Sequence, residues 1–300
     1  MLSVLIPSYN HAQFVIEAIS SARQIDVPGK HIYVIDDASS DNSAELIEKY
    51  LKFFGSEDMT FIRKPLNKGA IDSVLTFLAL CKTEFVYFMA SDDVAIAPGV
   101  SKLVELLRAQ PKFQFLIGGG INVFSDGRQT PIYSILHDKF FGLRPDILVK
   151  TAILSYPSPI LCQSTVFRLN AILSVGGFDS EITSDDYAIF TRLLLNYNSR
   201  GINFDFLPTI NCVEYRHHQS NSYLNIPRQA RNERQVIEKL APRTLRLRAL
   251  SGKIAFFSLV SIKRRSLKSL LQVMSMLRYN EIPWFIYEFV NISIKKILIH

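Results

Sequence analysis

Short apolar segments alternate with segments of helical periodicity over roughly the first 120 residues of the chain. The apolar segments, which we expect to be β-strands, are residues 2–6, 32–35, 59–63, 85–89 and 113–117. The spacing of apolar residues predicts helices at residues 12–23, 41–51, 71–81 and 98–109. Because the strands are apolar throughout rather than alternating, each is expected to be buried on both faces. The alternation therefore predicts an α/β fold, with a mostly parallel sheet flanked by helices.

Polar and acidic residues directly follow several of the expected strands. In an open parallel α/β sheet, ligands bind outside the carboxyl ends of the strands. The residues at these ends are Pro7, Ser8, Tyr9 and Asn10, then Asp36 and Asp37, then Arg63, Asn67 and Lys68, and finally Ser91, Asp92 and Asp93. The sequence thus predicts a binding site at one edge of the sheet, built from loops that are far apart in the chain.

Common nucleotide-binding signatures are absent from the sequence. No GxxxxGK[ST] segment occurs, and the glycines at 118–120 do not fit GxGxxG. A nucleotide at the predicted edge would meet carboxylates, which repel a diphosphate unless a cation lies between them. Asp92 and Asp93 are hard oxygen ligands suited to Mg²⁺ or Mn²⁺. Such an ion would neutralise the charge that builds on a departing diphosphate.

Each of these residues also has a purely structural interpretation. Asp36 and Asp37 follow a strand, where aspartate commonly forms turns, and Asp92 and Asp93 precede an expected helix start. Tyr9 could be a surface aromatic residue at a strand end. It is their joint occurrence on the ends of several strands that favours the functional interpretation.

The chain changes character after about residue 225, where the pattern becomes mostly helical and strongly basic. Residues 228–300 hold fifteen Lys or Arg and four Glu, a net charge of +11, whereas residues 1–227 hold nineteen basic and twenty-three acidic residues, a net charge of −4. Bulky apolar residues lie among these cations, which is typical of a helix on an anionic membrane rather than of a nucleic-acid-binding arm. The alternative is that these helices pack on the main domain or on a second copy in a homodimer.

Composition and cysteine content restrict the class of protein. Apolar residues make up 48% and charged residues 20% of the chain, which excludes wholesale disorder. The three cysteines, Cys81, Cys162 and Cys212, lack CxxC or metal-ligand spacing and are odd in number, so a reducing compartment is favoured. The sequence shows neither a signal-peptide pattern nor an apolar run long enough to span a bilayer, and we expect a cytoplasmic location.

Seven motifs, taken together in their order along the chain, carry a family resemblance. They are VLIPSYN at residues 4–10, YVIDDASSD at 33–41, NKG at 67–69, FMASDD at 88–93, GGFD at 176–179, SDDY at 184–187 with Arg192, and YRHH at 215–218. With these motifs the chain resembles glycosyltransferase family 2, the nucleotide-sugar transferases with the GT-A fold. The resemblance covers about 215 residues. It implies a Rossmann-like GT-A domain at 1–225, and we expect a basic, amphipathic helical extension at 226–300.

The resemblance also implies which residues bind the nucleotide of the donor. Tyr9 would pack on the nucleobase, and Asp37 would accept a hydrogen bond from it. The other nucleotide-binding residues implied in this way are Pro7, Ser8, Asp36, Arg63, Asn67, Lys68 and Asp92. UDP is the expected carrier of the sugar.

By the same resemblance, Asp92 and Asp93 stand at the motif for the metal and the ribose, and Asp93 is expected to be the direct ligand. His218 matches a late histidine of the family near the diphosphate or the metal, and neutral imidazole can ligate a divalent ion. Many members read Asp-x-Asp-Asp, and Ala90 here replaces the first Asp, which weakens the ribose contact. The implied cofactor is Mn²⁺ or Mg²⁺.

The pair Asp185 and Asp186 falls where the family often has Glu-Asp at the start of a helix. A helix N-terminus favours the ionised carboxylate. A direct displacement requires one carboxylate near the acceptor hydroxyl, to take its proton as the oxygen attacks. We assign this base to Asp186, with Asp185 as the competitor. A single displacement inverts the anomeric configuration.

The sequence therefore predicts an inverting glycosyltransferase that moves a sugar from a nucleoside-diphosphate sugar to a glycan acceptor. The basic, apolar tail favours a polyprenyl-diphosphate-linked acceptor at the inner face of the cell membrane, as in bacterial O-antigen or capsule synthesis. A sugar-1-phosphate nucleotidyltransferase is an alternative, disfavoured because Pro7, Ser8 and Tyr9 stand where its glycine- and arginine-rich loop would follow the first strand. A non-catalytic scaffold at the membrane is a second alternative, suggested by Ala90.

Overall fold

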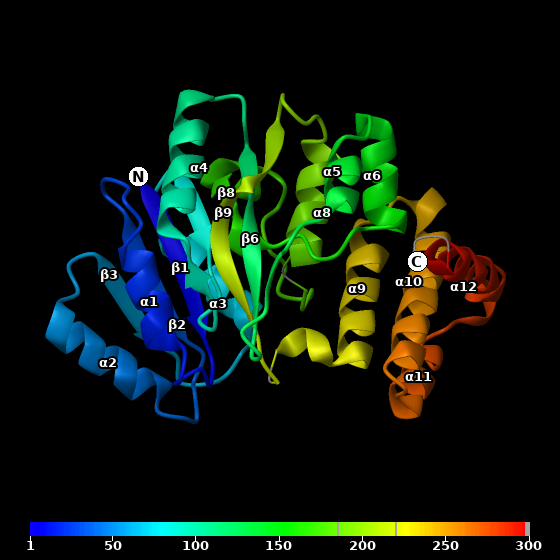
Figure 1. Ribbon diagram of the computed structural model, residues 1–300, viewed down its shortest axis with the longest axis horizontal. Coiled ribbons are helices and arrows are strands. Elements are labelled where there is room, and N and C mark those ends of the chain that lie inside the picture. Colours follow the sequence, from blue (N-terminus) through cyan, green and yellow to red (C-terminus); the bar gives the residue numbers. More distant parts are fainter. Residues whose placement is uncertain (185, 220, 298–300) are drawn as a thin grey trace.

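The computed structural model describes residues 1–184, 186–219 and 221–297 (Figure 1). Within these residues one sheet has nine strands, in the order β3-β2-β1-β4-β8-β6-β9-β5, and β7 pairs with β6. The strands are β1 (Leu2–Ser8), β2 (His31–Asp36), β3 (Met59–Arg63), β4 (Phe85–Phe88), β5 (Val94–Ala95), β6 (Phe115–Phe124), β7 (Gln129–Pro131), β8 (Thr165–Arg168) and β9 (Phe204–His217). The helices are α1 (Val15–Arg23), α2 (Ser43–Phe54), α3 (Ala70–Leu80), α4 (Ala97–Ala109), α5 (Ile135–Phe141), α6 (Pro145–Leu154), α7 (Leu169–Ser174), α8 (Asp186–Asn196), α9 (Ile226–Leu240), α10 (Arg243–Lys263), α11 (Leu267–Met274) and α12 (Ile282–Ile297).

The five apolar segments expected to be strands are β1, β2, β3, β4 and β6. β1 pairs in parallel with β2 and with β4, and β2 pairs in parallel with β3. β8 lies antiparallel between β4 and β6, so that β6 again runs in the direction of β4. β9 runs parallel to β6. The expected, mostly parallel sheet is thus present, and β8 is a reversed strand that the sequence pattern did not reveal.

Helices cover both faces of the sheet, as the uniformly apolar strands predicted. Val4 and Ile6 of β1 belong to one core, together with side chains from α1, α2 and α4. Leu5 belongs to a second core, together with side chains from α3 and α8. All three residues are fully buried, and each such burial stabilises the fold by about 1.5–3 kcal/mol. This two-sided burial fixes the register of the strands and therefore the positions of their ends.

The three glycines at 118–120 let β9 approach β6 closely. A Cβ atom on Gly119 would lie 2.0 Å from the carbonyl oxygen of Pro208, and one on Gly118 would lie 2.6 Å from Sγ of Cys212. The pairing of β6 with β9 shifts register at these glycines and then continues to the pair Phe124–His217. The glycines are therefore a packing feature that delivers the end of β9 to the predicted edge of the sheet.

The carboxyl ends of β1, β2 and β4 lie at the lower edge of the sheet in Figure 1. Backbone hydrogen bonds hold the segments after these strands against their neighbours. The N–H of Asp37 donates to the carbonyl of Ser8 over 2.8 Å, and the N–H of Met89 donates to the carbonyl of Leu5 over 2.9 Å. Asn10 has a φ of 54°, in the left-handed region, which turns the chain sharply after β1. The residues that follow the three strands therefore meet at one place.

The basic C-terminal segment folds against the rest of the protein. α9 and α10 share an apolar core with α6 and α8, in which Ile237, Leu250 and Ile153 are buried. Arg234 of α9 and Glu281 form two hydrogen bonds of 2.9 Å, and their side chains are 7% and 0% exposed. Of the two arrangements left open by the sequence, α9 and α10 adopt the one in which they pack on the main domain.

Two other expectations from the sequence concern the cysteines and membrane spans. The side chains of Cys81, Cys162 and Cys212 are all buried. In residues 1–184, 186–219 and 221–297, we find no helix with the length and apolar character needed to cross a membrane.

The buried ion pair between Arg234 and Glu281 predicts a large effect of Glu281→Ala. Removing one partner of a buried pair leaves the other charge uncompensated, and typically lowers the free energy of unfolding by about 3–5 kcal/mol. Urea denaturation followed by circular dichroism measures this change. The control is Glu105→Ala, because Glu105 is 66% exposed and pairs with Lys102 at the surface, so we expect a loss below about 1 kcal/mol. Equal losses in both variants would contradict this view of how the C-terminal helices are held.

Candidate active site

Asp37 holds the loop that follows β3 in place. It is 3% exposed, and its Oδ1 accepts hydrogen bonds from Nζ of Lys64 over 3.1 Å and from the N–H of Lys68 over 3.0 Å. Its Oδ2 accepts from the N–H of Gly69 over 2.6 Å, and Gly69 has a φ of +87° that favours glycine. Lys64, which the sequence did not single out, is itself buried and also pairs with Asp72 over 2.6 Å. Asp37 therefore positions the loop with the predicted nucleotide residues Asn67 and Lys68.

Asp36 is fully buried and forms the turn after β2. Its Oδ2 accepts from the N–H of Ser39 over 2.9 Å, and its Oδ1 accepts from the Ser39 hydroxyl over 2.6 Å. The Ser39 hydroxyl in turn accepts from the N–H of Asn10 over 2.9 Å. Asp36 thus contributes to the predicted site by connecting the turn after β2 to the turn after β1.

The other predicted nucleotide residues lie along the same edge, with different exposure. Tyr9 is 45% exposed, whereas Ser8 is 2% exposed at the end of β1. Arg63 is directed toward α2, where it pairs with Glu45 over 2.9 Å. It also lines an open cavity of about 420 Å³, together with Ala38, Ser39, Lys64 and Pro65. Pro7 lines a narrow cavity of about 60 Å³ that Asp186 also lines, so the β1 end adjoins the start of α8.

Three side chains at the end of β9, β4 and β1 form a candidate metal site. Nε2 of His218 lies 2.9 Å, and Nε2 of His11 3.8 Å, from Oδ2 of Asp92. All three ligand atoms lie within 4.8 Å of one another. Nδ1 of His11 hydrogen-bonds the Ser91 hydroxyl over 2.8 Å, which orients the ring as outer-sphere partners of metal ligands do.

The donor set of this site fits a divalent ion. Burial lowers the pKa of the His11 imidazole, which favours the neutral form that binds metals. Two imidazole nitrogens and one carboxylate oxygen suit Mn²⁺ and other transition metals better than Mg²⁺, which prefers oxygen ligands. The predicted ligands Asp92 and His218 belong to the site. His11 was missed by the sequence analysis, although it directly follows the VLIPSYN motif.

Asp93, which the sequence favoured as the direct ligand, is not one of the three clustered residues. It is 1% exposed, and its Oδ1 accepts from the N–H of Arg216 over 3.0 Å. Burial raises the pKa of its carboxyl group well above the usual range, and the neighbouring Asp92 and Asp186 raise it further. In this structure Asp93 anchors β9, the strand that leads to His218.

Asp186, the predicted base, is the first described residue of α8, and Asp185 lies outside the described residues. Oδ1 of Asp186 accepts a hydrogen bond from the N–H of Cys162 over 2.8 Å, which fixes the carboxylate. Burial raises the pKa of the Tyr215 phenol, and the carboxylates of Asp93, Asp92 and Asp186 raise it further. The acidic residues from two distant parts of the chain therefore converge around Tyr215.

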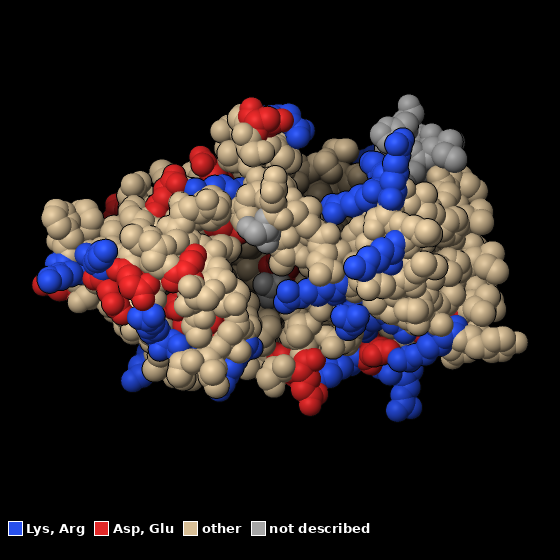
Figure 2. Space-filling model, turned by 90° about the horizontal axis from the view of Figure 1, so that it is seen from below, with Lys and Arg blue, Asp and Glu red and all other residues tan. Residues whose placement is uncertain are grey.

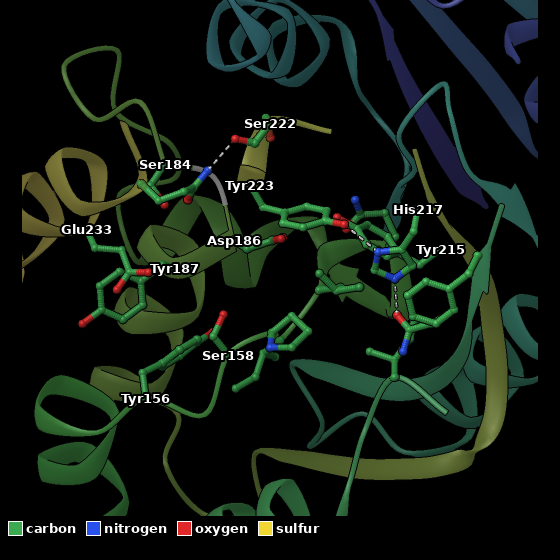
Figure 3. A pocket seen from close by; sticks show the side chains of 18 residues that line it. Tyr156, Ser158, Ser184, Asp186, Tyr187, Tyr215, His217, Ser222, Tyr223 and Glu233 are labelled. Atoms are coloured by element: carbon green, nitrogen blue, oxygen red, sulfur yellow. Dashed lines mark hydrogen bonds between the residues drawn. The ribbon is translucent and has the colours of Figure 1, made fainter. Parts of the chain in front are cut away.

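Asp186 also lines a larger cavity of about 470 Å³ (Figure 3). Figure 3 shows Asp186 between a side formed by Tyr156 and Tyr187 and a side formed by Tyr215 and His217. His217 is held by hydrogen bonds to the hydroxyl of Tyr223 over 2.7 Å and to Oδ1 of Asn122 over 2.9 Å. Aromatic walls with a few fixed polar groups are typical of a site for a small organic ligand.

The C-terminal helices form part of this cavity wall. Gln229 and Glu233 of α9 line the cavity. Glu233 forms an ion pair of 2.5 Å with the buried Lys253 of α10, whose ammonium lies 4.5 Å from the centre of the Tyr187 ring. The sequence analysis placed no site residue after 225, so these contributions were missed.

Two solved structures that superpose on this protein contain a bound nucleotide sugar. Over 96% of this chain and 79% of the other, the protein superposes on TarS residues 1–349 from S. aureus in complex with UDP-GlcNAc, with a TM-score of 0.59 and 17% identity. Over 99% and 86%, it superposes on the mannosyltransferase PcManGT from Pyrobaculum calidifontis in complex with GDP-Man and Mn²⁺, with a TM-score of 0.57 and 15% identity. At these identities the likeness establishes the fold, and it confirms the expected GT-A architecture.

The family is established by the sequence itself. The family model described as glycosyl transferase family 2 matches residues 3–164, and the chain belongs to this family. Among curated proteins, a poly-β-1,6-N-acetyl-D-glucosamine synthase from Staphylococcus epidermidis is 24% identical over 194 residues, which are 65% of this chain and 46% of that protein. A synthase of the same name from Staphylococcus aureus is 22% identical over 211 residues, 70% of this chain and 49% of that protein. The chain therefore spans about half the length of the curated relatives it matches.

The geometry of the candidate metal site predicts that His11→Ala weakens Mn²⁺ binding. Loss of an outer-sphere partner typically lowers the affinity for the metal by ~10–100-fold. Loss of one of the three protein ligands should lower it by at least as much. Isothermal titration with Mn²⁺ alone, without donor, measures this affinity. The matched control is His31→Ala, because His31 hydrogen-bonds Thr60 over 2.8 Å at the start of β2, at the opposite edge of the sheet. Unchanged affinity in His11→Ala, with loss in Asp92→Ala, would exclude His11 as a ligand.

Proposed function

We propose that this protein is an inverting glycosyltransferase that transfers a sugar from a nucleoside-diphosphate sugar to a hydroxyl group of a glycan acceptor. The observation that carries the proposal is the position of Asp186. It lines both the narrow cavity at the end of β1 and the large cavity with aromatic walls. A carboxylate held between a donor side and an acceptor side is what a single displacement requires.

The donor diphosphate would lie at the site formed by His11, Asp92 and His218, which fits Mn²⁺. When bound there, the ion supplies positive charge that stabilises the departing diphosphate. The nucleoside would lie along the ends of β1 and β2, where Tyr9 is exposed and Asp37 fixes the adjoining loop. The carboxylates at this edge would otherwise repel the diphosphate. The ion held by His11, Asp92 and His218 is therefore needed for the nucleotide sugar to bind.

The acceptor would enter the large cavity, with its reacting hydroxyl at Asp186. Asp186 takes the proton from this hydroxyl while the oxygen attacks the anomeric carbon on the face opposite the diphosphate. A carbon–oxygen bond to the acceptor forms, and the bond to the diphosphate breaks, so the nucleoside diphosphate leaves. The N–H of Cys162, which donates to Oδ1 over 2.8 Å, keeps the carboxylate in place for this step.

A UDP-sugar is the first donor to test. TarS has been crystallised with UDP and with UDP-GlcNAc, and the curated relatives are named for a polymer of N-acetyl-D-glucosamine, which supports this order of testing. The sugar-1-phosphate nucleotidyltransferase alternative is not favoured, since the family match and the loop after β1 both argue for transfer of a sugar.

Substitution of the proposed base predicts a selective loss of activity. Asp186→Asn should lower the rate of UDP release from a UDP-sugar with Mn²⁺ by about 10²–10⁴-fold, because general base catalysis is lost. UDP binding, measured by isothermal titration, should stay unchanged. The matched control is Asp146→Asn on α6, where the carboxylate is 65% exposed. Full activity in Asp186→Asn would exclude Asp186 as the base, and an inactive wild type with every donor would favour the scaffold alternative.

We further propose that the protein works in the cytoplasm, at the inner face of the cell membrane, on a polyprenyl-diphosphate-linked acceptor of surface polysaccharide synthesis such as O-antigen or capsule. The outer face of α12 supports membrane contact. Ile286, Val290 and Ile294 follow one another at a spacing of four residues and are 57%, 51% and 50% exposed. Residues 228–300 carry a net charge of +11, so an anionic bilayer is the surface that complements both properties.

The membrane proposal predicts that Ile286→Glu/Val290→Glu abolishes sedimentation with phosphatidylglycerol vesicles. Two carboxylates on this face would be repelled by the anionic headgroups and would not enter the acyl region. The control is Phe53→Glu on α2, because Phe53 is exposed to 81% but lies at the other end of the molecule. If wild type and the α12 variant sediment equally, the membrane proposal is wrong, and loss of a dimer by light scattering would show that this face binds a second copy instead.

A further inference from the structure

A second cavity lies across α9 from the large aromatic cavity. It has a volume of about 430 Å³ and is lined from α9 by Arg228, Arg231, Asn232 and Gln235. Adjacent residues of the same segments line the two cavities. Thr183 and Arg228 line the second one, whereas their neighbours Ser184 and Gln229 line the first. The two cavities therefore flank the first turns of a single helix.

The side chains that line this second cavity are mostly hydrogen-bond donors. Among the described residues that line it, there are two arginines, four side-chain amides, of which Asn225 precedes α9 and Gln272 belongs to α11, and no carboxylate. Guanidinium groups bind phosphate oxygens through two parallel N–H donors, and they remain charged at any physiological pH. A cavity with this lining selects an anion with several oxygen atoms.

Nearby acidic residues do not neutralise the two arginines. Both arginines are exposed, and in the described part of the chain their side chains form no ion pair. The neighbouring carboxylates are bound to other cations. Glu233 pairs with Lys253 over 2.5 Å, Glu238 with Arg278 over 2.6 Å, and Asp179 with Lys239 over 3.1 Å.

The surface around the cavities also carries an excess of basic over acidic side chains. Figure 2 views the molecule from the side on which the strand ends lie, and a hollow is visible near its centre. To the right of this hollow, where the C-terminal helices lie, Lys and Arg side chains outnumber Asp and Glu side chains. To the left, the two kinds of charge are mixed. An anionic group would be attracted to the right-hand rim.

We propose that the cavity at Arg228 and Arg231 binds a phosphate group while the glycan end of the acceptor occupies the aromatic cavity. This inference rests on the proposed function, since it assigns the aromatic cavity to the acceptor. The source of the phosphate is either the acceptor itself, as a phosphodiester or diphosphate, or the headgroup of a membrane lipid.

Binding of inorganic pyrophosphate to Arg228→Gln/Arg231→Gln tests the proposal. The titration is done on the full chain with EDTA, so that no metal complex forms and the carboxylates at the strand ends repel pyrophosphate from the nucleotide site. We expect the dissociation constant of pyrophosphate to rise at least tenfold in this variant, since the charge-assisted hydrogen bonds from both guanidinium groups are lost. Both residues are exposed, so the melting temperature of the variant should match that of the wild type.

The matched control is Lys49→Gln/Lys52→Gln. These two cations are also exposed and one turn apart, on α2 at the far end of the molecule, so the variant loses the same charge elsewhere. Pyrophosphate binding should be unchanged in it. Equal weakening in both variants, or no weakening in the α9 variant, would overturn the proposal.

A second measurement separates the two sources of phosphate. If the α9 variant binds pyrophosphate weakly but sediments normally with phosphatidylglycerol vesicles, the phosphate belongs to the acceptor. If it loses both, the phosphate belongs to a lipid headgroup. UDP release from a UDP-sugar in the presence of Mn²⁺, with water as acceptor, should be unchanged in the α9 variant. If neither the wild type nor the variants release UDP, the proposed function is refuted. The proposal for this cavity depends only on the pyrophosphate titration.

Discussion

Burial of the parallel strands on both faces is the constraint on which the site depends. Val4 and Leu5 are adjacent in β1 and lie in two different cores, so β1 can neither shift nor turn over without exposing apolar surface. The same burial fixes β2 and β4 beside it. Because parallel strands end at one edge, the chain must place Tyr9, Asp37 and Asp92 near each other, although they come from separate segments.

The crowding of carboxylates at this edge is resolved by giving them different roles. Asp36 and Asp37 are used within the protein, where they hold the turn after β2 and the loop after β3. Asp93 is buried and accepts a hydrogen bond from the N–H of Arg216, which holds the segment after β4 against β9. Asp92 remains with two imidazoles as a candidate metal site, and Asp186 remains as a carboxylate between two cavities. Asp36, Asp37 and Asp93 thus have structural roles, whereas Asp92 and Asp186 are available for chemistry.

The C-terminal helices serve the site as well as the surface. Inward, the pairs Arg234–Glu281 and Glu233–Lys253 join α9 to the segments around it, and Glu233 faces the aromatic cavity. On the other side of α9, Arg228 and Arg231 line a cavity without a carboxylate among the described residues. The basic residues that the sequence shows in this region therefore have two roles. Some form buried ion pairs, and others stay exposed at the surface.

The sequence by itself determined five of the strands (β1, β2, β3, β4 and β6), the helices between them and the residues at their ends, because each depends on a local pattern of apolar and polar side chains. It also carried the family, through motifs that are each continuous in the chain. Only the tertiary structure decided that His11, rather than Asp93, lies with Asp92 and His218 at the candidate metal site, and that α9 forms a cavity wall. His11 and Asp92 are about eighty positions apart, and Asn122 of β6 and Gln229 of α9, which line the same cavity, are about a hundred apart. These arrangements follow from how the elements pack and not from any pattern along the chain.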